Sequence, residues 1–159
     1  MKKMGTLILV MVGFMLAATA QEKKVYDGYK ELVAEAKQQI EVIDLHGFHE
    51  KYMDGLKNRK PDYILLDVRT ADEYHAGHVP GAYLVQRGVL ESHIAKEAVW
   101  EGFRHAVPKK DDTIILYCRS GSRSALATKT LMTLGYTHVY SLDGGWKAWH
   151  EEYPKLERF

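Results

Sequence analysis

The segment from Cys118 to Arg123 places a nucleophile among groups that attract anions. The apolar run at 113–117 predicts a buried strand that carries Cys118 at its carboxyl end, the edge of an open α/β sheet where ligands bind. A helix is predicted to begin within six residues, and Gly121 tolerates the backbone angles that so short a loop needs. The loop should therefore turn its backbone N–H groups inward around one centre, beside the positive end of a helix dipole.

This setting predicts a reactive sulfur. Nested N–H groups and a helix dipole favour the thiolate form of Cys118 over the thiol. Arg119 and Arg123 add two positive charges, and the forked donors of arginine suit tetrahedral oxyanions. We therefore expect a nucleophilic thiolate inside a binding site for an anionic substrate. The alternative is an inert buried cysteine beside two solvated arginines, since free cysteine is often a core residue.

Composition points to one soluble domain. The 159 residues are 46% hydrophobic and 27% charged, the balance of a globular protein. Lysine and arginine number 22 against 21 acidic residues, a near-neutral charge that argues against a nucleic-acid binder. With one cysteine, the chain cannot form an internal disulfide.

The first twenty residues have the layout of a secretory signal peptide. Lys2 and Lys3 form a basic start, residues 5–20 carry no charge, and Ala18-Thr19-Ala20 is a small-residue cleavage site. The uncharged stretch is shorter than the roughly 20 residues that span a bilayer as a helix, which favours cleavage over retention as an anchor. We therefore expect an exported protein, periplasmic or secreted, without stable membrane insertion after cleavage.

Strands and helices are predicted to alternate along the remaining chain. Strands are predicted at 40–43, 63–66, 82–85, 113–117 and 139–141. Helices are predicted at 25–39, 48–56, 124–134 and 146–152, with a short one starting at a Thr70 capping box and a helical or irregular segment at 88–107. This alternation implies a mostly parallel sheet covered on both faces.

Four short blocks stand in a distinctive order. They are Asp67-Val68-Arg69 with Glu73-Tyr74, then Gly77-His78-Val79-Pro80-Gly81-Ala82, then Cys118 to Arg123, then Gly144-Gly145-Trp146 with Trp149. Each block alone is weak, but together the chain resembles a single-domain rhodanese, a thiosulfate sulfurtransferase. The resemblance implies a rhodanese-like α/β domain at 40–155, with a mostly parallel five-stranded sheet flanked by helices on both faces. A signal peptide at 1–20 and a helical lead-in at 21–39 would precede it.

The resemblance also implies a mechanism. The Cys118 thiolate would attack the outer sulfur of thiosulfate, sulfite would leave, and cyanide or a thiol would then take the sulfur from the persulfide. The loop residues Arg119, Ser120, Gly121, Ser122 and Arg123 would bind the substrate, with N–H groups on the persulfide and both arginines on the sulfonate. The expected partners are a small anionic sulfur donor and a thiol or thioredoxin-like acceptor. No metal or organic cofactor is needed.

The residues around this loop are expected to be structural. We predict an Arg69–Glu73 ion pair, Asp67 bonded to neighbouring backbone, and His78 as a hydrogen-bonding turn residue. The alternatives are a substrate contact for Arg69 and a base role for His78.

Three further features are less defined. Arg87 is a candidate for a third positive group at the pocket mouth. Trp100 and Phe103 are expected to fill the core, with pocket cover as the alternative. The histidine pairs at 46/49 and 75/78 lack the ligand partners of a metal site.

Two rival functions stay open. A cysteine phosphatase or arsenate reductase of related fold has an arginine six residues after its cysteine, whereas Ser124 holds that position here and Arg123 comes one residue earlier. The shorter loop suits a sulfur atom better than a phosphate. The second rival is a sulfur carrier that forms the persulfide but turns over little.

Overall fold

The computed structural model describes residues 24–58 and 61–156, so the predicted signal peptide at 1–20 lies outside the described residues. The strands are β1 (Glu41–Ile43), β2 (Ile64–Asp67), β3 (Tyr83–Leu84), β4 (Thr113–Tyr117) and β5 (His138–Leu142). The helices are α1 (Tyr29–Gln38), α2 (Leu45–Asn58), α3 (Ala71–His75), α4 (Leu90–His93), α5 (Glu97–Gly102), α6 (Ser122–Thr133) and α7 (Gly145–Glu152), with a short 3-10 turn η1 (Arg87–Val89).

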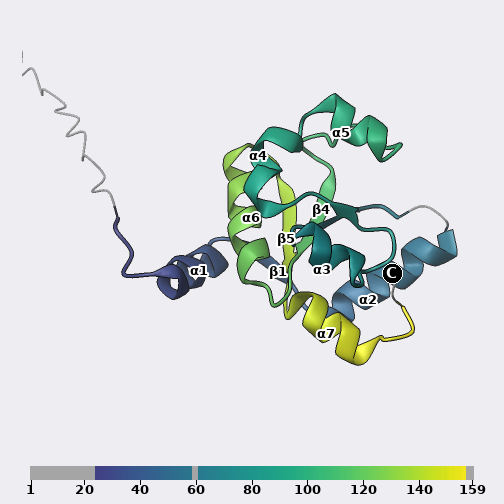
Figure 1. Cartoon of the computed structure of the whole chain (residues 1–159), viewed down its shortest axis with the longest axis horizontal. Helices are drawn as coiled ribbons and strands as arrows, with labels where there is room; N and C mark the ends of the chain where they lie inside the picture. Colours follow the sequence, from purple (N-terminus) through teal and green to yellow (C-terminus); the bar gives the residue numbers. More distant parts are fainter. Residues whose placement is uncertain (1–23, 59–60, 157–159) are drawn as a thin grey trace, which may run out of the picture.

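One five-stranded sheet forms the centre of the fold (Figure 1). Its strands run in the order β1-β5-β4-β2-β3, and every neighbouring pair is parallel. The carboxyl ends of all strands therefore meet at one edge, and β4 lies in the middle of the sheet. The predicted fold class, a parallel α/β sheet with helices on both faces, is confirmed.

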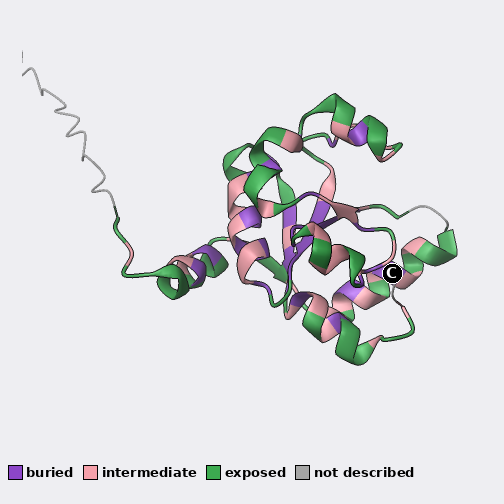
Figure 2. Cartoon of the chain, in the orientation of Figure 1, coloured by how far each residue is buried: buried purple, intermediate pink, exposed green. Residues whose placement is uncertain are grey.

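The apolar runs of β2 and β4 supply both faces of the core. Because side chains alternate along a strand, Leu66 and Leu116 face one side with Trp100, which belongs to a cluster that α4, α5 and α6 cover. Leu65 and Ile115 face the other side, where α2 and α7 add further aromatic side chains. Figure 2 shows this pattern as buried segments concentrated in the central strands. Trp100 is fully buried, so its predicted core role is confirmed.

Local sequence signals explain several element boundaries. Thr70 caps α3 through the predicted capping box with Glu73, in which each side chain binds the other residue's backbone N–H. Helix α6 begins two residues earlier than predicted, because Gly121 adopts a left-handed conformation (φ 91°) and starts the helix directly after it. The segment at 88–107 is divided between η1, α4 and α5.

Helix α1 packs against α6 beside the main body of the fold (Figure 1). Its Val33 and Ala36 are buried, whereas Val25 is 83% exposed and lies before the helix, which begins at Tyr29 rather than at the predicted position 25. Within the part of the chain that the structure describes, every helix is too short or too polar to cross a bilayer.

We expect Leu116→Ala to lower the free energy of unfolding by about 2–5 kcal/mol, because it leaves a cavity in the central strand. Leu134→Ala is the matched control, since Leu134 is 39% exposed, and it should cost roughly 1 kcal/mol or less. Denaturant unfolding measures both changes. Equal losses would contradict the placement of Leu116 in the core.

Candidate active site

The sulfur of Cys118 lies just past β4, enclosed by the loop that follows it. Cys118 is 1% exposed. The backbone N–H of Gly121 donates to Sγ at 3.2 Å, and the Ser124 hydroxyl donates to it at 3.6 Å. The sulfur therefore sits at the end of the apolar core but meets polar donors, as a thiolate requires.

Helix α7 fixes the opposite side of the loop. Its backbone N–H groups at Trp146 and Lys147 donate to the carbonyls of Cys118 and Arg119, at 2.8 and 3.0 Å. Gly145 makes this approach possible, because a Cβ at that position would lie 2.3 Å from the Cys118 carbonyl oxygen. Its φ of 56° also lies in the left-handed region that favours glycine. The Gly144-Gly145 turn is thus part of the site.

Arg123 forms an ion pair with Glu73 across the loop. Its two terminal nitrogens donate to the two carboxylate oxygens, each at 2.7 Å. This bond and the Thr70 cap hold the pKa of Glu73 at about 2, below the ordinary 4.5. Glu73 also raises the pKa of the Arg123 guanidinium, and the side chain of Cys118 adds to the rise. Arg123 therefore interacts with both the carboxylate and the Cys118 side chain.

The predicted Arg69–Glu73 ion pair is wrong, because Arg69 binds Asp67 instead. The two are nearly fully buried, two residues apart where the chain bends after β2, and their charged ends meet at 2.6 Å. Asp67 also accepts from the backbone N–H of Arg69, the backbone contact expected of it, and Arg69 donates to the Gly77 carbonyl at 2.7 Å. The guanidinium lies 4.9 Å from the ring centre of Trp146. At 2% exposure, Arg69 has no surface left for a substrate.

His78 lies in the turn after α3, as expected of a structural residue. Its Nδ1 is 3.0 Å from the Tyr74 carbonyl oxygen, and its ring stacks on the Tyr74 ring at 3.8 Å. Burial lowers the pKa of His78 below the ordinary 6.5. The imidazole is therefore held neutral near pH 7 by its place in the turn.

Arg87 does not lie at the mouth of the loop, contrary to the prediction. Its guanidinium donates to Glu91 at 2.8 Å and to Thr130 at 3.1 Å. Thr130 is two turns beyond the start of α6, about 12 Å along the helix from Ser122. The chain after β3 runs toward the carboxyl-terminal half of α6, so Arg87 lies beside Thr130.

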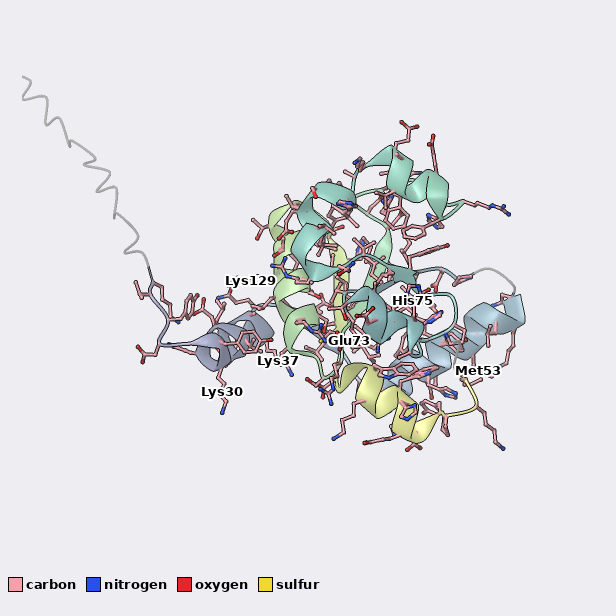
Figure 3. All side chains as sticks on the ribbon, in the orientation of Figure 1. Lys30, Lys37, Met53, Glu73, His75 and Lys129 are labelled. Atoms are coloured by element: carbon pink, nitrogen blue, oxygen red, sulfur yellow. The ribbon has the colours of Figure 1, made fainter. Side chains whose placement is uncertain are left out.

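Lys37 is a residue near the site that the sequence analysis missed. Its Nζ lies 3.4 Å from Asp143 Oδ1 and 3.7 Å from where a Cβ at Gly121 would stand. Figure 3 shows Lys37 of α1 and Glu73 of α3 on the two sides of the start of α6. Sequence spacing could not reveal this contact, because it depends on how α1 folds back onto the domain.

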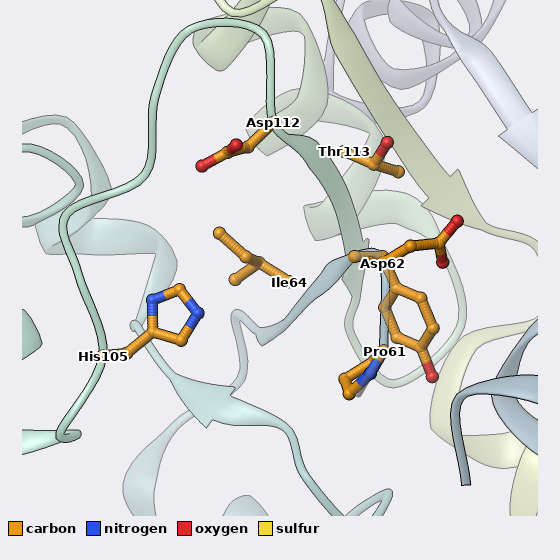
Figure 4. A pocket seen from close by; sticks show the side chains of 7 residues that line it. Pro61, Asp62, Ile64, His105, Asp112 and Thr113 are labelled. Atoms are coloured by element: carbon orange, nitrogen blue, oxygen red, sulfur yellow. The ribbon is translucent and has the colours of Figure 1, made fainter. Parts of the chain in front are cut away.

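The structure also has a hollow far from the sulfur (Figure 4). It has a volume of about 240 Å³ and is lined by Pro61, Asp62, Tyr63, Ile64, His105, Asp112 and Thr113. These residues gather at the amino ends of β2 and β4, roughly 16 Å from the carboxyl end of β4. The hollow is therefore separate from the Cys118 loop. Among the described residues, no group of three or more histidine, cysteine, aspartate or glutamate side chains could hold a metal ion.

We expect Glu73→Gln to lower the free energy of unfolding by about 1 kcal/mol near pH 7, a value reduced for solvent screening of this partly exposed pair. The pKa of Glu73 is depressed in the folded state, so its contribution is present above about pH 4.5 and lost as the pH falls toward about 2. Denaturant unfolding of both proteins across this range tests it. A difference that stays constant with pH would show that the carboxylate charge is not the cause.

The family model that matches this chain covers the whole Cys118 loop. A family model described as "Rhodanese-like domain" matches residues 48–152. A Schizosaccharomyces pombe protein named "Putative thiosulfate sulfurtransferase, mitochondrial" is 31% identical over 91 residues, 56% of this chain. The chain spans only 64% of the length of that relative.

Two solved structures share the fold. The human single-domain sulfurtransferase TSTD1 is 28% identical with a TM-score of 0.62, over 70% of this chain and 96% of that one. A Rhodopseudomonas palustris protein of unknown function, described as a possible tyrosine phosphatase, is 27% identical with a TM-score of 0.65, over 82% and 95%. Because these descriptions name different chemistry, the loop itself has to distinguish sulfur transfer from phosphoryl transfer.

Proposed function

The chain belongs to the rhodanese-like domain family, and from this premise we propose that it is a sulfurtransferase that carries sulfur on Cys118. The Cys118 thiolate attacks the outer sulfur of thiosulfate or a related donor; an S–S bond forms, and sulfite leaves with the electron pair of the broken bond. Cyanide or a thiolate then attacks the terminal sulfur, and the Cys118 thiolate is released. Each step exchanges one bond to sulfur for another, so neither step needs a metal or an organic cofactor.

The enclosure of the sulfur is the observation that carries this proposal. Cys118 is 1% exposed, between the Gly121 N–H and the Ser124 hydroxyl. A site this narrow suits the transfer of a single atom at the end of a small donor, and fixed donors around a developing charge need no rearrangement during the reaction.

The loop argues against phosphoryl transfer. A phosphate needs donors on several oxygens, and the arginine that would supply them in a cysteine phosphatase is replaced here by Ser124. Arg123, one residue earlier, already gives both terminal nitrogens to Glu73. We therefore propose sulfur rather than phosphate as the transferred group.

The sulfonate of the donor needs a positive group at the loop. Sequence reasoning assigned this role to Arg119 and Arg123, and the occupied guanidinium of Arg123 leaves Arg119 as the better candidate. The Arg119 side chain is exposed and makes no hydrogen bond or ion pair within the described ranges, although the Arg119 carbonyl accepts from the Lys147 N–H. We propose that Arg119 binds the sulfonate, while Arg123 supplies positive potential next to the sulfur.

The acceptor and the compartment remain proposals from the sequence. The signal-peptide pattern at 1–20 supports a protein exported to the periplasm or secreted. A small thiol or a thioredoxin-like protein is the class of acceptor that this chemistry requires there.

Intact-mass analysis after incubation with thiosulfate tests the first half-reaction. We expect the protein to gain one sulfur atom, and Cys118→Ser to gain none, because Cys118 is the only thiol. Thiocyanate formation with cyanide then tests turnover. Hydrolysis of an aryl phosphate without any mass gain would support the phosphatase instead. A persulfide that forms once and that only a protein partner discharges would support a carrier.

Arg119→Met tests the sulfonate contact. We expect kcat/KM for thiosulfate to fall about tenfold, the loss of one charge-assisted contact, while kcat/KM for a neutral thiol acceptor stays unchanged. Added salt should reduce the difference in kcat/KM for thiosulfate between the wild type and the variant, because salt screens the charge of Arg119. Lys30→Met removes an exposed charge from α1 and is the control, with both constants unchanged. An equal fall in kcat/KM for thiosulfate and for the thiol acceptor would contradict a specific contact between Arg119 and the donor.

A further inference from the structure

A chain of two hydroxyls leads from β5 to the sulfur. The Ser141 hydroxyl donates to Ser124 Oγ at 2.9 Å, and the Ser124 hydroxyl donates to Cys118 Sγ at 3.6 Å. Ser124 is 0% exposed and Ser141 is 2% exposed. The three polar atoms therefore meet inside the protein, where water does not compete for their hydrogen bonds.

The backbone holds both serines in place. Ser141 pairs in register with Leu116, two residues before Cys118 on the adjacent strand. Ser124 lies in the first turn of α6, directly after the loop. The helix thus presents the Ser124 hydroxyl to the sulfur, and the sheet places the Ser141 hydroxyl against Ser124. Both serines are buried, whereas the loop residues Arg119 and Ser120 are exposed.

We call this chain of hydrogen bonds, from Ser141 through Ser124 to Cys118, the relay. The order of its donors gives it a direction. A hydroxyl has one proton to donate. Because Ser141 donates to Ser124, the proton of Ser124 is free for the sulfur. Hydrogen bonds in series polarise one another, so the Ser141 bond strengthens the donation of Ser124. A donated hydrogen bond stabilises a thiolate more than a neutral thiol.

We propose that Ser124 is a catalytic residue that stabilises the Cys118 thiolate, and that Ser141 is a positioning residue that acts through Ser124. This inference rests on the proposed sulfurtransferase function. In the free enzyme, Ser124 donates its hydrogen bond to the nucleophilic sulfur. In the persulfide, the negative charge lies on the terminal sulfur. When the acceptor attacks that sulfur, the S–S bond breaks and its electron pair returns to Sγ, where Ser124 donates.

The ultraviolet absorbance of the thiolate tests the proposal, because Cys118 is the only cysteine and Cys118→Ser provides the blank. We expect Ser124→Ala to move the pH midpoint of this absorbance upward by roughly one unit, the effect of one hydrogen bond to a charged group. Ser124→Thr keeps the hydroxyl and should restore most of the shift. Single-turnover discharge of the persulfide by cyanide should slow about tenfold in Ser124→Ala, even above the new midpoint.

Ser141→Ala should move the midpoint in the same direction by roughly half as much. In the Ser124→Ala background, Ser141→Ala should leave the pH midpoint of the thiolate absorbance where Ser124→Ala placed it, because Ser141 acts through Ser124. Thr128→Val is the matched control. Thr128 is on the same helix and fully buried, and its hydroxyl meets no hydrogen-bond partner within the described part of the chain. Its removal should leave the midpoint unchanged.

Three outcomes would overturn the relay. They are an unchanged midpoint in Ser124→Ala, equal shifts from Ser141→Ala in both backgrounds, and a shift of the same size from Thr128→Val. If Ser124→Ala does not fold, Ser141→Ala decides the matter, since it leaves the loop intact, and an unchanged midpoint then overturns the relay. In each case the wild-type protein still gains sulfur from thiosulfate. Failure of that gain would instead overturn the proposed function.

Discussion

Two hydrogen bonds from α7 decide which way the Cys118 loop faces. The N–H groups of Trp146 and Lys147 hold the carbonyls of Cys118 and Arg119 outward. Because the N–H and C=O of a trans peptide point in opposite directions, these two bonds turn the N–H groups of Arg119 and Ser120 away from α7. The next N–H along the loop, that of Gly121, donates to the sulfur. The whole arrangement depends on a residue without a side chain at Gly145, since a Cβ there would lie 2.3 Å from the Cys118 carbonyl oxygen.

Two ion pairs hold the segments around this loop together. The arginines in these pairs are bound to carboxylates, so their charges are partly neutralised before any ligand binds. Arg69 and Asp67 form a buried pair below Trp146, the residue whose N–H holds the Cys118 carbonyl. Arg123 and Glu73 tie the first turn of α6 to α3. Removing one partner of the buried pair would leave an uncompensated charge in the core, so both residues of that pair are structural requirements. Arg119 stays exposed at the loop, and Lys37, paired with Asp143, also lies near it.

The parts of the structure that sequence reasoning predicted well are those with local causes. The β4 run, the Thr70 capping box and the glycine turn before α7 each follow from neighbouring residues. The contacts that it missed join distant segments. Arg123 and Glu73 are 50 residues apart, Lys37 and Asp143 are 106 apart, and the two serines behind the sulfur are 17 apart. The Arg69–Glu73 prediction failed because it applied helical spacing to a residue that precedes the helix, in the bend between β2 and α3.

The enclosure of Cys118 also governs its chemistry toward other copies of the protein. A disulfide between two chains would bring their Cβ atoms to about 3.5–4.5 Å from each other. The loop, α6 and α7 surround the single thiol, which is 1% exposed, and hold a second molecule farther away than that. A disulfide between two folded copies of this protein therefore requires the loop to move away from the sulfur.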